Sequence, residues 1–224
     1  REGNPVGYYV PGMDAKPLEG NTLILVHQTL HNPKVSDKKL LDDCMIEVDW
    51  EGNILWKWSI TDHFDELGFD EAALNILARN PNMRSSDGGV GDYQHVNCMS
   101  YLGPNKWYDQ GDQRFKPDNI IFDCRESNIL AILDKETGHI VWRIGPDFNA
   151  TPELRKLGWI IGQHHFHMIP KGLREKAICW YSTMAAGPAM ACQTQAPGTA
   201  RKMPCVITAA YWNSIRLLWK SYGN

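Results

Sequence analysis

Two short polar runs and one arginine carry side chains that could bind or attack an anion. His95 and Asn97 stand two residues apart, and residues 163–167 read Gln-His-His-Phe-His. Arg125 adds a guanidinium group where the neighbouring residues are mainly apolar. Considered together, imidazole, amide and guanidinium donors suit a tetrahedral oxyanion such as sulfate or phosphate. A histidine can also act as a nucleophile or as a general acid or base, because its pKa lies near neutrality.

When each of these residues is considered separately, a simpler role also fits it. His95 could cap a turn, and Arg125 could form an ion pair with Asp123 or Glu126. The histidines of residues 163–167 could line a polar strand edge. No Gly-rich phosphate-binding loop accompanies any of them, so nucleotide binding is not indicated.

A metal site is a third possibility for the histidine-rich run. His164, His165 and His167 offer three imidazoles within four residues. Zinc, however, prefers three or four converging ligands with a second shell of hydrogen bonds, and no carboxylate in a spaced motif accompanies these histidines.

The strands that must carry these residues are predicted from alternation of apolar and polar positions. Residues 92–142 contain about four short alternating runs with turn residues between them, which predicts one four-stranded antiparallel sheet. Residues two apart on a strand face the same side, so His95 and Asn97 should share a face, with Arg125 on the neighbouring strand. On a regular strand His165 and His167 would likewise share a face, opposite His164.

The same strand pattern recurs along the chain. Residues 45–58 and 134–142 each form a hairpin pattern with an Asp-led turn containing Gly and a second strand bearing Trp. An Asn-led strand precedes each hairpin. Four strands per unit are typical of a β-propeller blade, and propellers have about four to eight blades. The fold class is therefore predicted as all-β, a partial propeller over residues 1–175 with units at about 6–60, 92–144 and 162–175.

Two segments interrupt the repeats. Residues 69–79 have helical spacing and end at Asn80-Pro81, which predicts a short inserted helix. Residues 103–117, which include Trp107 and Tyr108, are expected to form a long loop.

The composition excludes several classes of protein. The 224 residues are 43% hydrophobic, as in a globular protein, and the net charge of −3 provides no basic surface for nucleic acid. No apolar run approaches a membrane span, so neither a membrane span nor a nucleic-acid partner is expected. The six cysteines include no CxxC pair, which indicates neither a zinc site nor a dense disulfide framework, although Cys44, Cys98 and Cys124 could pair.

The last part of the chain differs from the rest. No Asp, Glu or His follows Glu175, and residues 176–224 show no strand alternation. Written in plausible codons and read two nucleotides later, residues 179–186 can spell Leu-Val-Phe-Asp-Asn-Gly-Gly, and residues 211–224 can spell a hairpin like that at 133–143. We interpret residues 176–224 as an out-of-frame or non-native segment that follows a frameshift near residues 173–176. The chain is expected to be an incomplete fragment of the ring.

The motifs in order resemble the arylsulfate sulfotransferase family, bacterial enzymes that use no nucleotide sulfate donor. The resemblance covers roughly residues 4–172. Its motifs are Asp92-x-x-His95-x-Asn97, Arg125-x-x-Asn128 with the hairpin at 134–143, and Gln163-His164 followed by Met-Ile-Pro-Lys-Gly at 168–172.

The resemblance implies a six-bladed propeller in which a channel histidine takes a sulfuryl group from a phenolic sulfate ester and passes it to a phenol. By motif, His164 matches this nucleophile, while His95, Asn97 and Arg125 match the residues that hold the sulfuryl oxygens. The partners would be a small aryl sulfate donor and a phenolic acceptor, without a cofactor, and the family likeness implies the periplasm. A further channel histidine of the family has no clear counterpart, because His27 lies one strand away from the expected inner strand.

Two other functions stay open on the residues alone. The chain could be a non-catalytic propeller that binds a ligand or a protein. Alternatively, it could be a metal-dependent esterase that uses His164, His165 and His167.

Overall fold

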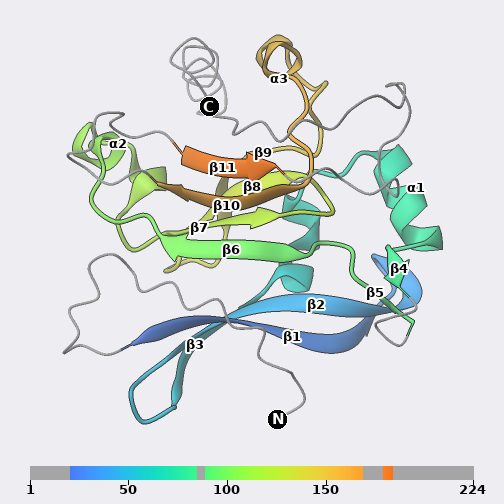
Figure 1. Cartoon of the computed structure of the whole chain (residues 1–224), viewed down its shortest axis with the longest axis horizontal. Coiled ribbons are helices and arrows are strands. Elements are labelled where there is room, and N and C mark those ends of the chain that lie inside the picture. Colours follow the sequence, from blue (N-terminus) through green and yellow to red (C-terminus); the bar gives the residue numbers. More distant parts are fainter. Residues whose placement is uncertain (1–20, 85–88, 169–178, 184–224) are drawn as a thin grey trace.

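Three β-sheets, with short helices between their strands, make up the described part of the chain (Figure 1). The structure is a computed structural model in which residues 21–84, 89–168 and 179–183 are described. The sheets follow one another in chain order, and the second lies between the first and the third (Figure 1). The mostly-β architecture agrees with the predicted all-β class.

The first sheet has five strands. Its strands are β1 (Thr22–Asn32), β2 (Ser36–Val48), β3 (Ile54–Ser59), β4 (Met83–Arg84) and β5 (Val90–Gly91). The long strand β2 pairs antiparallel with both β1 and β3, as the predicted hairpin requires. It also pairs in parallel with β5 through Leu40 and Gly91, which the sequence did not predict. The strand expected near residue 6 lies outside the described residues.

The second sheet is the predicted four-stranded antiparallel sheet. Its order is β6 (Val96–Tyr101), β7 (Ile120–Cys124), β8 (Ile129–Leu133) and β9 (Ile140–Ile144). Apolar side chains of β7 and β8 alternate between two cores. Ile120, Phe122 and Ala131 pack toward the first sheet, whereas Ile121 and Ile132 pack toward the third. Both faces are covered, which explains why these two strands are almost continuously apolar.

The third sheet pairs β10 (Gln163–Met168) with β11 (Cys179–Thr183). Strand β10 begins where the third unit was predicted. The three sheets therefore have five, four and two described strands instead of four each, and they form no closed ring within the described residues. The predicted boundary at residue 175 stays a prediction, because residues 169–178 and 184–224 lie outside the described part.

The two predicted hairpin turns have the expected chemistry. Gly52 and Gly138 have φ angles of +86° and +78°, which glycine adopts without steric cost. Asp49 Oδ1 accepts a hydrogen bond from Asn53 N at 2.7 Å, and Asp134 Oδ1 accepts from Thr137 N at 3.0 Å. Short-range hydrogen bonds thus fix both turns.

The inserted helix is confirmed as α1 (Glu71–Arg79), whose N-cap Asp70 accepts a hydrogen bond from Ala73 N at 2.8 Å. The segment 103–117 is not a plain loop. It contains α2 (Lys106–Asp109) and η3 (Gln113–Phe115), and Trp107 and Phe115 pack into the core beside the second sheet. The remaining helices, η1 (Ile60–Glu66) and α3 (Pro152–Leu157), were not predicted.

Two further expectations concern cysteines and membranes. Cys44, Cys98 and Cys124 are buried free thiols, so the pairing considered for them does not occur. Among the described helices, none is long and apolar enough to cross a membrane.

Candidate active site

The four predicted site residues lie on neighbouring segments of the second and third sheets. His95 precedes β6, Asn97 is in β6, Arg125 follows β7 directly, and His164 is the second residue of β10. Arg125 N donates to the His95 carbonyl oxygen at 3.0 Å. Asn97 Nδ2 donates to the carbonyl oxygen of Gln163, the residue before His164, at 3.1 Å. The structure therefore brings all four residues together.

The electrostatic environment of His164 also reflects this convergence. Partial burial lowers the pKa of His164, and the positive charges of Arg125 and His95 lower it further, while the Gly162 carbonyl and Glu126 oppose the shift. His164 Nδ1 lies 3.1 Å from the Gly162 carbonyl oxygen. A carbonyl oxygen can accept a hydrogen bond but cannot donate one. The neutral ring of His164 therefore carries its proton on Nδ1 and its lone pair on Nε2. This is the protonation state that a histidine nucleophile needs.

His95 does not sit in a regular strand, contrary to the prediction. Its φ angle is +52°, strand β6 begins only at Val96, and the pairing with β7 is irregular at Asn97. His95 and Asn97 are therefore not two positions of one regular strand. The Arg125 and Glu126 N–H groups donate to the carbonyl oxygens of His95 and Gln94, so the end of β7 holds the chain in this irregular conformation where it enters β6.

The same irregularity occurs at the start of the third sheet. His165 has a φ angle of +64°, and the pairing of β10 with β11 shifts between His164 and His167. The rings of His165 and His167 contact each other at a centroid distance of 4.7 Å, while the His164 ring bonds to the Gly162 carbonyl. Unfavourable left-handed φ angles at two histidines of equivalent position require strong restraint from the surroundings.

Two buried aspartates supply this restraint. The sequence suggested no role for Asp43 and considered Asp123 only as a possible ion-pair partner of Arg125. Asp43 in β2 accepts a hydrogen bond from Val96 N at 3.1 Å, and Asp123 in β7 accepts one from Phe166 N at 3.0 Å. Each aspartate thus links the second strand of one sheet to the residue after the left-handed histidine in the next sheet. The available signal was an acidic residue inside an apolar strand, as in Ile-Ile-Phe-Asp-Cys at 120–124.

The two aspartates differ in their partners. Burial raises the pKa of Asp123 to about 7, although backbone N–H groups of Phe166, Asn97 and Cys98 oppose the shift. Asp43 forms an ion pair with His27 Nε2 at 2.9 Å. The hydrogen bond to Asp43 raises the pKa of His27 despite partial burial, and Asp92 adds to this effect. His27, which had no assigned role, therefore lies beside the carboxylate of Asp43, which holds β6 through Val96 N.

The polar side chains of the site already have protein partners. His95 Nδ1 lies 2.6 Å from Asp92 Oδ2, so this carboxylate orients the ring. Arg125 forms an ion pair with Glu126, which confirms one of the simpler roles considered for it. A guanidinium group has five N–H donors, so this pair leaves Arg125 able to bind an anion as well.

A metal centre at residues 163–167 gains no support from the geometry. Among the described residues, the group of three possible ligands whose atoms all lie within 4.8 Å is His63, Glu66 and His139. No histidine of β10 belongs to it. A polar depression of the described surface, lined by residues including Asn32 and Asp62, also contains none of the four predicted site residues.

Comparison with known proteins decides the family. The model of the Arylsulfotransferase (ASST) family matches residues 14–182, most of the chain. The chain belongs to this family. The match confirms the resemblance and supports a sulfotransferase enzyme in general, and small aryl substrates fit this family. Searches of curated proteins and of solved structures returned no match.

Proposed function

We propose that this chain transfers a sulfuryl group from a phenolic sulfate ester to a phenol acceptor through a sulfohistidine on His164. The observation that carries the proposal is the meeting of His164, His95, Asn97 and Arg125 at one place, with His164 neutral and its Nδ1 bonded to a carbonyl. The chain would be one part of a larger propeller.

In the first half-reaction, the lone pair on His164 Nε2 attacks the sulfur atom. An N–S bond forms, the S–O bond to the aryl group breaks, and its electron pair leaves with the phenolate. In the second half-reaction an acceptor phenol, whose proton passes to solvent or to the departing phenolate, attacks the same sulfur. The N–S bond then breaks and returns the lone pair to His164.

The neighbouring donors would stabilise the transition state. Charge on the three sulfuryl oxygens is balanced by Arg125 and by His95, which Asp92 holds in place. Asn97 has two amide N–H groups, of which one serves the Gln163 carbonyl, so the other suits a sulfuryl oxygen.

The test is to incubate the whole chain with an aryl sulfate alone and to examine it by mass spectrometry. We expect one added SO3 group on His164 and release of the phenol. Changing His164→Asn should abolish both, whereas His31→Asn, at an exposed histidine of β1, should change neither. Phenol release that persists unchanged in His164→Asn would remove His164 as the nucleophile.

The non-catalytic propeller is the competing function. It predicts that the chain binds an aryl sulfate without releasing phenol or gaining mass. The family likeness also leads us to propose the periplasm as the compartment.

A further inference from the structure

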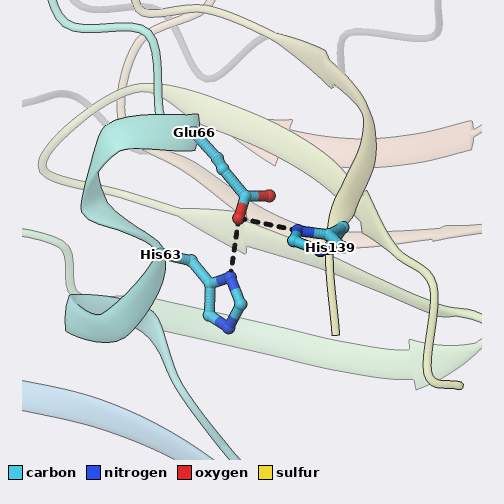
Figure 2. Close-up of side chains that lie close together, drawn as sticks. All are labelled: His63, Glu66 and His139. Atoms are coloured by element: carbon cyan, nitrogen blue, oxygen red, sulfur yellow. Dashed lines mark hydrogen bonds and ion pairs between the residues drawn. The ribbon is translucent and has the colours of Figure 1, made fainter. Parts of the chain in front are cut away.

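A second group of polar side chains lies between the first and second sheets, at the end of β8 opposite to Arg125. His63 and Glu66 come from η1, and His139 comes from the turn between β8 and β9 (Figure 2). Glu66 Oε1 lies 2.8 Å from His63 Nδ1 and 3.1 Å from His139 Nδ1. Figure 2 shows both imidazole rings directing Nδ1 at this single oxygen.

The distances are close to those of a metal-binding site. Ligand atoms of a tetrahedral zinc ion lie about 3.3 Å apart, because each bond is about 2.0–2.1 Å long. Two of the three separations are already near this value, and the third is at most 4.8 Å. His139 is 67% exposed on a turn, so a small movement of its side chain would close the remaining gap.

The surroundings hold two of the ligands in place. Ile140 N donates to Glu66 Oε2 at 2.7 Å, which orients the carboxylate, and the Trp58 ring stacks on His63 at 5.0 Å. The carboxylate and one of the two imidazoles are therefore already oriented before an ion binds.

We propose that His63, Glu66 and His139 bind one divalent transition-metal ion of the zinc class. Two imidazoles and one carboxylate are a known zinc donor set, and water would complete the tetrahedron. On binding, each Nδ1 gives its lone pair to the metal, and its hydrogen moves to Nε2 or to solvent. The ion would cross-link η1 of the first sheet to the β8–β9 turn of the second.

The experiment is titration of the whole metal-free chain with Zn²⁺ alone, followed by calorimetry and by equilibrium dialysis with elemental analysis. We expect one tightly bound ion per chain and a rise of the melting temperature with Zn²⁺. His139→Gln removes an exposed ligand outside the core, so the variant should fold normally. It should bind at least about 100-fold more weakly, since even changes to residues that only hydrogen-bond to a metal ligand cost about 10- to 100-fold in metal affinity.

Two controls separate this site from other histidines. His31→Gln removes an exposed histidine of β1, and the double variant His165→Gln/His167→Gln removes the other close histidine pair. Both should retain the tight site and the increase in melting temperature. The proposal is overturned if the unaltered chain binds no stoichiometric Zn²⁺, or if the double variant loses the tight site while His139→Gln keeps it.

Discussion

At the residue scale, the behaviour of His164 depends on what surrounds its ring. Partial burial and the nearby charges of Arg125 and His95 disfavour the imidazolium form, and the Gly162 carbonyl selects the tautomer. Neither effect follows from the Gln-His motif alone. Both favour the neutral ring with its lone pair on Nε2, which is the form that the proposed role of His164 as a nucleophile requires.

The first prediction concerns the pH dependence of phenol release. Because the pKa of His164 lies below the ordinary value of 6.5, the ring stays neutral at neutral pH and becomes protonated only in more acidic solution. The rate should therefore fall on the acid side with a midpoint below pH 6.5. Single-turnover rates with an aryl sulfate measure this midpoint. A midpoint above 6.5 would contradict the proposed environment.

The second prediction concerns Asp123 and stability. Burial raises its pKa from 3.8 to about 7, so the folded chain keeps a proton that the unfolded chain has already lost. Since the unfolded state then binds fewer protons, this group makes stability fall as pH rises from about 4 to about 7, by on the order of 4 kcal/mol.

Asp123→Asn should remove this contribution, because the amide does not titrate. Urea unfolding at several pH values measures the difference between the two proteins. The free energy of unfolding of the unaltered chain, minus that of Asp123→Asn, should decrease steadily as pH rises from about 4 to about 7. A difference that does not change with pH would show that Asp123 has an ordinary pKa.

At the element scale, consecutive sheets are joined by a repeated contact. Asp43 and Asp123 each accept a backbone hydrogen bond from the first strand of the next sheet, at Val96 and Phe166. The residue before each donor is a histidine with positive φ. These contacts connect the position of the site residues to the packing of the sheets, so their loss should affect both.

The third prediction tests this contact. Asp43→Ala leaves the buried N–H of Val96 without an acceptor and removes the partner of His27, which should cost about 1–3 kcal/mol of unfolding free energy. Asp43→Asn keeps an acceptor and should cost less. Urea denaturation measures both, with Asp37→Ala at an exposed position of β2 as the control. Equal effects of Asp43→Ala and Asp37→Ala would refute the role of the contact.

At the scale of the whole molecule, the first two sheets share one hydrophobic core. Phe122 of β7 is fully buried in this core. The ring of Trp58 in β3 packs against the Phe122 ring with a centroid distance of 5.6 Å, and Trp58 Nε1 donates a hydrogen bond to the Gly138 carbonyl oxygen at 2.8 Å. Because both sheets contribute to the same core, they should unfold together instead of one at a time.

The fourth prediction follows from this shared core. Phe122→Ala should cost about 3–5 kcal/mol and should lower the unfolding midpoints of both sheets equally. Hydrogen exchange of β2 and β8 amides measures this directly. Leu55→Ala, at a 55% exposed position of β3, should change stability by less than about 0.5 kcal/mol. Loss of protection in β8 alone would show that the sheets are independent.

The sequence by itself determined the features that depend on neighbours along the chain. Alternation in residues 92–142 predicted the four-stranded sheet of β6 to β9, the turns around Gly52 and Gly138 followed from their Asp and Gly residues, and helical spacing that ends at Asn80-Pro81 predicted α1. The order of the sequence motifs also pointed to the family that the match over residues 14–182 confirms.

Only the tertiary structure decided which distant residues meet. The aspartate contacts between sheets join residues 53 and 43 positions apart, and Glu66 and His139 are 73 positions apart. No pattern along the chain predicts these contacts, the parallel pairing of β5 with β2, or the left-handed histidines. Burial likewise set the protonation of Asp123 and His164. The physical reason is that desolvation and long-range hydrogen bonds exist only after the sheets have packed.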